Sequence, residues 1–141
     1  MIYLDSNVFI YPELVEVANG NIAEFSKGLL KAVVNGKISA ATSVLTWDEL
    51  IWVLKKRFGY EVAMKASAKF LKFPGLKLLK VDEKIIHSAQ SIVEKYGVNP
   101  RDSIHAACCV ENGINRIVSE DVDFDKVTLL TRFSIERFKD F

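Results

Sequence analysis

Apolar residues along the chain fall into short runs that alternate with longer stretches of helical spacing. Such short runs predict buried strands, and the longer stretches predict amphipathic helices. The predicted strands are residues 2–4, 38–41, 76–81, 114–119 and 127–130. The predicted helices are residues 23–35, 44–58, 61–72, 83–96, 100–112 and a last one from Ser134. Because strands separated by helices need parallel crossovers, this order predicts a three-layer α/β/α fold with a mainly parallel central sheet, in one domain over residues 1–141.

Polar residues mark the expected starts of several helices. Ser43 and Asp82 each precede a helical stretch, where their side chains are suited to cap the free backbone N–H groups. Pro100 stands at the start of another, a position that tolerates its missing N–H. These signals divide the chain into the elements given above and leave no linker between domains.

Acidic residues follow two of the predicted strands. Asp5 comes directly after the first strand, and Asp121 and Asp123 come after the fourth. Asp102 stands in the first turn of a predicted helix, and Glu49 lies early in the helix that follows the second strand. Ligands of parallel α/β sheets bind at the carboxyl ends of the strands. We therefore expect these acids to lie near that edge of the sheet.

Each acid by itself has an ordinary structural explanation. Asp5 can simply end a strand, Asp102 can be favoured by the helix dipole, and Glu49 can face solvent. Taken together they would repel one another, and burying several carboxylates without compensation is costly. A divalent cation such as Mg²⁺ or Mn²⁺ resolves this repulsion through oxygen ligands. A site of that type supports hydrolysis of phosphodiesters.

The composition is that of a folded globular domain. Of 141 residues, 50% are hydrophobic and 26% are charged, with a formal net charge of +1. This apolar share excludes disorder, and no apolar run approaches the roughly 20 residues of a membrane-spanning helix. The N-terminal MIYLDSN lacks the features of a signal peptide, so we expect a cytoplasmic protein without a membrane partner. The neighbouring Cys108 and Cys109 are suited to a helical core, not to a disulfide.

The small net charge hides a segregation of charge along the chain. Between Lys55 and Lys84 nine basic residues face three acidic ones, a balance of +6. Between Arg101 and Asp125 six acidic residues face two basic ones, a balance of −4. This asymmetry indicates either a basic surface for a polyanion beside an acidic metal pocket, or a solvated lysine-rich helix face.

Three motifs resemble those of PIN-domain proteins, and among them the VapC-like toxin ribonucleases of prokaryotic toxin–antitoxin modules. They are YLDSN at 3–7, SVLTWDEL at 43–50 with Glu49 at the glutamate position, and RDSIHAACCVENGINRIVSEDVDFDKV at 101–127. Their order and spacing match the family over essentially the whole chain. The serines at 6 and 119 replace a frequent threonine and keep its hydroxyl.

The resemblance implies a PIN-like fold and a Mg²⁺- or Mn²⁺-dependent endoribonuclease. The implied catalytic quartet is Asp5, Glu49, Asp102 and Asp121, and the implied metal ligands are Asp5, Asp102, Asp121 and Asp123. Asn7, Ser119 and His105 would support these carboxylates. The implied partners are an RNA substrate, a small antitoxin protein and further copies of the chain in a homodimer or higher homo-oligomer.

Cations and aromatic residues of the middle segment are candidates for contact with RNA. Lys55, Lys56 and Arg57 suit the RNA backbone, because phosphate binding needs cations without strict geometry. Trp52 is expected to pack in the core, with base stacking or an oligomer contact as the alternative.

Other functions remain open at this point. A phosphatase of the haloacid dehalogenase type would need a second aspartate at position 7, where this chain has Asn7. A catalytically inactive PIN module that binds RNA or protein would lack one of the acids, and none is missing. A PIN nuclease of RNA processing, free of any antitoxin, is the third alternative.

Overall fold

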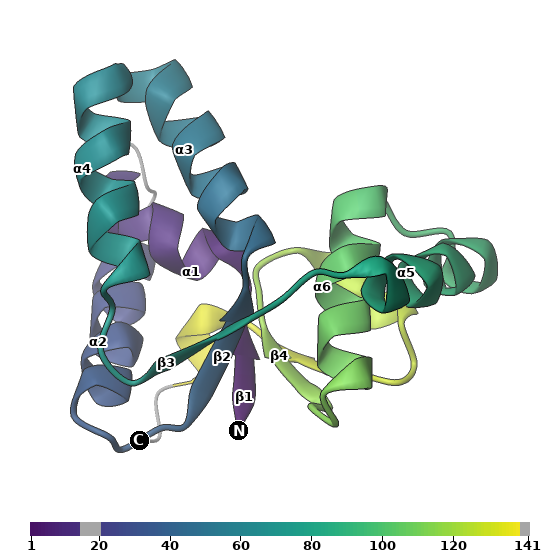
Figure 1. Ribbon diagram of the computed structural model, residues 1–141. Helices are drawn as coiled ribbons and strands as arrows, with labels where there is room; N and C mark the ends of the chain where they lie inside the picture. Colours follow the sequence, from purple (N-terminus) through teal and green to yellow (C-terminus); the bar gives the residue numbers. More distant parts are fainter. Residues whose placement is uncertain (15–20, 139–141) are drawn as a thin grey trace.

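Five parallel strands form the central sheet of the computed structural model, which describes residues 1–14 and 21–138 (Figure 1). The strands are β1 (Ile2–Leu4), β2 (Ala40–Ser43), β3 (Leu76–Leu79), β4 (Arg116–Val118) and β5 (Thr131–Phe133). Their order across the sheet is β3-β2-β1-β4-β5, and all four pairings are parallel. The predicted parallel α/β architecture is confirmed.

Helices cover both faces of this sheet (Figure 1). They are α1 (Ser6–Ile10), α2 (Ile22–Val34), α3 (Leu45–Phe58), α4 (Tyr60–Leu71), α5 (Glu83–Tyr96) and α6 (Pro100–Glu111). Shorter 3-10 helices are η1 (Tyr11–Leu14), η2 (Val122–Lys126) and η3 (Ile135–Arg137). Helices α5 and α6 lie on one face and α1 to α4 on the other. Across the described ranges, no helix has both the length and the apolarity that crossing a membrane requires.

The central strand β1 supplies side chains to two separate cores. Tyr3 packs into the core under α5 and α6, which also contains Cys108 and Cys109. Ile2 and Leu4 pack into the core on the opposite face. Successive side chains of a strand point to opposite faces, so a strand buried on both sides is apolar throughout. This explains why the strand before Asp5 has no polar residue.

The carboxyl ends of β1 and β4 lie side by side. Tyr3 pairs with Ile117 and Leu4 with Val118, and the backbone N–H of Asp5 donates to the carbonyl of Val118 at 3.1 Å. The loop after β1 therefore begins beside the loop after β4. This register brings the two acidic sequence motifs together.

The second strand and the helix after it begin later than predicted. Ser43 is the last residue of β2, paired with Leu79, and the residue before α3 is Val44, which gives no side-chain cap. The prediction of Ser43 as an N-cap is wrong because its backbone belongs to the sheet ladder. The Asp82 cap is confirmed: its Oδ1 accepts from the backbone N–H of Ile85 at 3.1 Å.

The C-terminal part also differs from the prediction. Residues 127–130 form no strand, and β5 follows them at Thr131–Phe133. Val127 and Leu130 are apolar because they are buried at a turn. Instead of a long last helix, the short η3 follows Ser134, and residues 139–141 of that prediction lie outside the described residues.

Candidate active site

Asp5 is held at the end of β1 by four hydrogen-bond donors. Its Oδ1 accepts from the backbone N–H of Ser6 at 2.7 Å and more weakly from the Ser6 hydroxyl at 3.4 Å. Its Oδ2 accepts from Asn7 Nδ2 at 2.9 Å and from Ser119 Oγ at 2.6 Å. The residue is only 5% exposed and caps the short helix α1. The LDSN motif thus fixes one carboxylate in a single orientation.

Ser119 connects the loops after β1 and β4. Its hydroxyl donates to Asp5, and it accepts from Asn7 Nδ2 at 3.1 Å and from the backbone N–H of Asp121 at 3.0 Å. A hydroxyl has one donor and two acceptor sites, so Ser119 is fully used. Asp121 in turn caps η2 by accepting from the backbone N–H of Asp123 at 2.9 Å.

His105 connects Glu49 to Asp5, because both carboxylates lie near the same ring nitrogen. Glu49 Oε2 lies 2.7 Å from His105 Nε2, and Asp5 Oδ1 lies 3.6 Å from the same nitrogen. The other ring nitrogen, Nδ1, lies 2.6 Å from the hydroxyl of the fully buried Tyr3. Possible ligand atoms of Asp5, Glu49 and His105 all lie within 4.8 Å of one another.

The hydrogen bonds of His105 assign its role. Burial raises the pKa of Tyr3 well above its usual value, so the phenol keeps its proton and can donate to Nδ1. The Nε2–H group of the imidazole then donates to Glu49. Burial opposes ionisation of Glu49, but the hydrogen bond from His105 outweighs this and lowers the pKa of Glu49. With both nitrogens engaged, His105 is a hydrogen-bonding partner of the carboxylates.

Asp102 brings a further negative charge from the first turn of α6. Burial, followed by the charges of Asp121 and Asp5, raises its pKa to about 6. Burial likewise raises the pKa of Asp5, against the effects of His105 and Ser119. The negative charges of Asp121 and Asp5 therefore act on Asp102, and that of Glu49 acts on Asp5, while His105 offsets part of this effect.

This donor set fits a hard divalent cation. Carboxylate oxygens are the ligands that Mg²⁺ and Mn²⁺ prefer. Asn7 Oδ1 is buried and, within the described part of the chain, has no hydrogen-bond partner. A buried acceptor of this kind usually finds a water or an ion. Asp123 is placed differently, because Lys126 Nζ lies 2.7 Å and Asn99 Nδ2 lies 3.4 Å from its carboxylate.

Two residues of the site were not found by sequence reasoning. Tyr3 reads as an ordinary apolar strand residue, and no sequence signal marks its bond to His105. Arg132 on β5 donates to the backbone carbonyl of Ser119 at 3.0 Å and pairs with Asp125 at 2.9 Å. It was missed because the fifth strand was predicted too early in the chain.

The cationic candidates lie on α3, about two turns after Glu49. Lys55, Lys56 and Arg57 occupy the last turn of α3, where cations also complement the helix dipole. Lys56 Nζ lies 5.1 Å from the ring centroid of Trp52. Trp52 is 54% exposed, so the prediction that it packs in the core is wrong.

Comparison with known proteins identifies the family to which a chain with this fold and these acidic residues belongs. The PIN domain family model matches residues 2–130, and the chain belongs to the PIN domain family.

Particular relatives are found among VapC proteins. The chain is 27% identical over 139 residues to Ribonuclease VapC2 of Methanocaldococcus jannaschii, covering 92% of this chain and 90% of that protein. It resembles the structure of VapBC2 from Rickettsia felis bound to a promoter DNA fragment, with a TM-score of 0.71, 17% identity and coverage of 95% and 98%. It also resembles Mycobacterium tuberculosis VapC20, described as a sarcin–ricin loop cleaving toxin, with a TM-score of 0.72, 18% identity and coverage of 91% and 95%. The structural likenesses at this identity establish the fold.

Proposed function

We propose that this protein is a Mg²⁺- or Mn²⁺-dependent endoribonuclease of the VapC type, acting in the cytoplasm as the toxin of a toxin–antitoxin module. One observation carries the proposal. Asp5, Glu49, Asp102 and Asp121 come from four elements: ligand atoms of Asp5 and Glu49 lie within 4.8 Å of each other, and the charges of Asp121 and Asp5 help burial to raise the pKa of Asp102 to about 6. The similarity to a ribonuclease of the same family supports RNA as the substrate.

The quartet would hold the cation, with Asp123 as an auxiliary acid. The ion supplies neutralisation of phosphate charge and activation of water for phosphodiester hydrolysis. The chain's own residues prepare this site. Ser119 and Asn7 hold the Asp5 carboxylate, and His105 keeps Glu49 ionised and oriented. Such fixed outer hydrogen bonds orient ligands before substrate arrives.

Cleavage of RNA by the purified chain tests this proposal. We expect Mg²⁺ or Mn²⁺ to support internal cleavage of a single-stranded RNA and EDTA to stop it. Glu61→Gln, which changes an exposed acid on α4, is the matched control for the acidic variants and should cleave normally. Binding of RNA without cleavage in either metal would instead favour the catalytically inactive PIN module.

The cations at the end of α3 are proposed to contact the RNA backbone. Exposed cations bind phosphate by releasing counterions, and the salt dependence of binding reports their number. Charge reversal at Lys55, Lys56 and Arg57 should weaken RNA binding and flatten its dependence on salt concentration. An unaltered slope would reject this surface.

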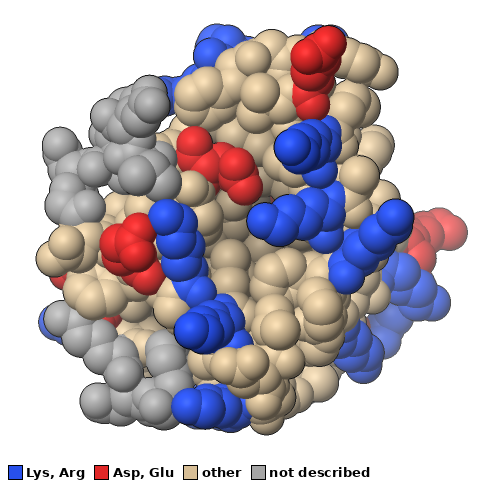
Figure 2. All heavy atoms as spheres, turned by 90° about the vertical axis from the view of Figure 1, so that its left-hand side faces the viewer, with Lys and Arg blue, Asp and Glu red and all other residues tan. Residues whose placement is uncertain are grey.

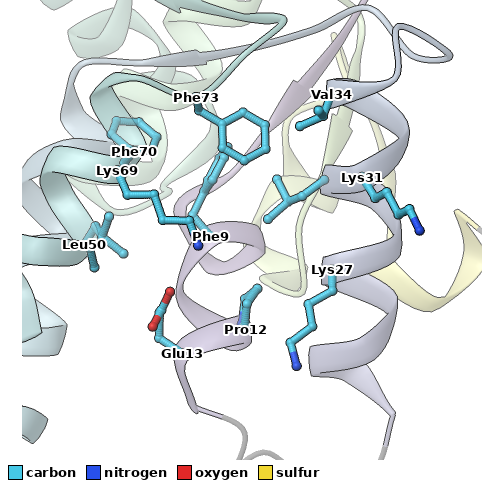
Figure 3. A pocket seen from close by; sticks show the side chains of 12 residues that line it. Phe9, Pro12, Glu13, Lys27, Lys31, Val34, Leu50, Lys69, Phe70 and Phe73 are labelled. Atoms are coloured by element: carbon cyan, nitrogen blue, oxygen red, sulfur yellow. The ribbon is translucent and has the colours of Figure 1, made fainter.

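A separate groove is suited to the proposed antitoxin. A cavity of about 540 Å³ lies between α1, α2 and α4, with Phe9, Phe70 and Phe73 in its wall (Figure 3). Lys27, Lys31 and Lys69 border it. Figure 2 shows cations gathered on this face of the molecule. The apolar wall and the bordering lysines are suited to a small protein that inserts an apolar segment flanked by acidic residues.

Copurification tests the antitoxin proposal. Reversal of Lys27, Lys31 and Lys69 to glutamate should release a small protein encoded beside this chain's reading frame and leave RNA cleavage by the free chain unchanged. Reversal of the exposed Lys77 on β3 is the control. Unchanged copurification after the triple reversal would move the contact elsewhere. Absence of any inhibitory partner would favour an RNA-processing nuclease.

Size-exclusion chromatography with light scattering tests the proposed homodimer.

A further inference from the structure

Trp52 is a large aromatic side chain that remains about half exposed to solvent in the folded protein. It lies on α3 and is 54% exposed. A single exposed apolar residue is common on protein surfaces and carries no argument by itself. The surroundings of this one set it apart, because two cations from different helices lie near its ring.

Two cations from different helices lie against the Trp52 indole. Lys56 Nζ, one turn further along α3, is 5.1 Å from the ring centroid, and Arg101 Cζ, from the first turn of α6, is 5.7 Å from it. Both distances are within the range of cation–π attraction. Asp48, Trp52 and Lys56 recur every four residues and form one stripe of α3. Arg101 reaches across to this stripe, with Nη2 3.9 Å from Asp48 Oδ2.

The stripe borders the catalytic carboxylates on both helices. Asp48 directly precedes Glu49, and Arg101 directly precedes Asp102. Arg101 is also close enough for its charge to act on Glu49. A nucleotide chain with one phosphate at the quartet can therefore reach this aromatic and its cations. The further cations Lys55 and Arg57 continue the positive surface along the last turn of α3.

A structural role alone does not account for the arrangement. The Arg101 and Asp48 side chains are 52% and 58% exposed, and an ion pair so exposed contributes little to stability. Exposure of the indole also forgoes the stabilisation that its burial would give. An accessible aromatic face beside cations is the combination with which proteins bind unpaired nucleotides: bases stack on the ring and cations bind the backbone.

We propose that Trp52, Lys56 and Arg101 form a nucleotide subsite that stacks an unpaired base of the RNA next to the scissile phosphate. This inference rests on the proposed ribonuclease function and adds a requirement for single-stranded RNA at that position. Stacking accepts every base, so the subsite selects strandedness in preference to sequence. Lys56 and Arg101 bind the phosphates on either side of the stacked base.

Fluorescence gives a test that does not depend on cleavage. The chain has two tryptophans, so Trp47→Phe leaves Trp52 as the only indole. In an Asp102→Asn background, which prevents cleavage, a short oligouridylate should quench this fluorescence to saturation. The matched Trp52→Phe variant keeps Trp47, which is 41% exposed, and its fluorescence should remain unchanged. Equal quenching of both indoles, or of neither, would overturn the proposal.

Kinetics provide the second test. In the wild-type background Trp52→Ala should raise KM for single-stranded RNA roughly 5- to 100-fold, the effect of losing one stacked base, with little change in kcat. Trp52→Tyr should restore most of the loss, and Trp47→Ala should leave KM unchanged. An unchanged KM in Trp52→Ala would overturn the subsite. Dissociation of a dimer by Trp52→Ala without a change in KM would assign the residue to contact with a second copy.

Failure of the proposed function gives a different pattern. If the wild-type chain does not cleave RNA, no KM can be measured. The fluorescence experiment then still decides whether Trp52 binds nucleotides. If the wild-type chain cleaves and Trp52→Ala matches it in KM, only the subsite fails.

Discussion

The two halves of the acidic site are built in different ways. In one half Asp5 and Glu49 are bonded to Ser119, Asn7 and His105, with almost no access to water. In the other half, Asp102 lies half-buried near Asp121, and the main influences on its pKa are burial and like charge.

The difference shows which carboxylates the protein orients by itself and which carry a repulsion that a bound ligand would relieve. The first half is oriented by hydrogen bonds that exist without any ion. The second half is held together by the fold against its own repulsion, and a cation would relieve that repulsion. The following predictions use activity and stability to separate the halves.

Loss of one carboxylate from either half should remove activity equally. Asp5→Asn and Asp102→Asn are both expected to lower the rate of RNA cleavage by on the order of 10²- to 10³-fold or more, as loss of a charge-stabilising group does elsewhere. Initial rates with Mg²⁺ on one RNA substrate give the comparison. Full activity in either variant would remove that residue from the quartet.

Removal of His105 should damage the hydrogen-bonded half most. His105→Ala leaves Glu49 and Tyr3 without their buried partner, which should lower the free energy of unfolding by about 3 kcal/mol. Urea denaturation without metal measures the loss. His87→Ala, at a side chain that is 79% exposed, is the control and should change stability by less than about 0.5 kcal/mol. Equal effects of the two substitutions would contradict a positioning role for His105.

Addition of Mg²⁺ should stabilise the folded protein by relieving the repulsion between Asp102 and Asp121. At a concentration about 100 times the dissociation constant, a ligand that binds only the folded state adds about 2.7 kcal/mol. Thermal unfolding with and without Mg²⁺ measures this gain. We expect Asp102→Asn to lose most of the gain and Glu61→Gln to keep it. An equal gain in all three proteins would show that the ion binds elsewhere.

Neutralisation of Asp102 should stabilise the metal-free protein. Its pKa rises from 3.8 to about 6 on folding, so the folded state favours the protonated acid. The associated stability is complete below pH 3.8 and is lost as the pH rises through about 6. At pH 7 in EDTA, Asp102→Asn should therefore gain about 1–2 kcal/mol, after allowance for screening by water. A lower melting temperature for this variant under those conditions would contradict the proposed repulsion.

Sequence reasoning names the polar residues at this edge better than it predicts their contacts. It includes Asn7, Ser119 and His105 as supporting residues, but not the bonds of His105 to Glu49 and Tyr3. Asp5 and Asp121 follow apolar strands, and parallel pairing of β1 with β4 is enough to bring such acids together. The partner of Glu49 depends on side chains 56 residues apart, and Tyr3 and His105 are 102 residues apart. No local pattern specifies those distances.

Errors in element boundaries have local physical causes. The five residues of α1 are too few to show helical periodicity, so this helix was not predicted. Ser43 satisfies the pattern of an N-cap, but pairing with Leu79 keeps its backbone in β2. Trp52 satisfies the pattern of a core residue, and its half-exposed ring shows that helical spacing alone does not distinguish a buried aromatic from an exposed one.

The position of β1 in the middle of the sheet has a consequence for the order of synthesis. Asp5 is made before its partner Ser119, which follows 114 residues later. Strand β1 cannot gain its neighbour β4 until most of the chain has left the ribosome. Such long-range pairing also slows folding. A nascent or truncated chain that lacks β4 therefore carries an unassembled acidic site.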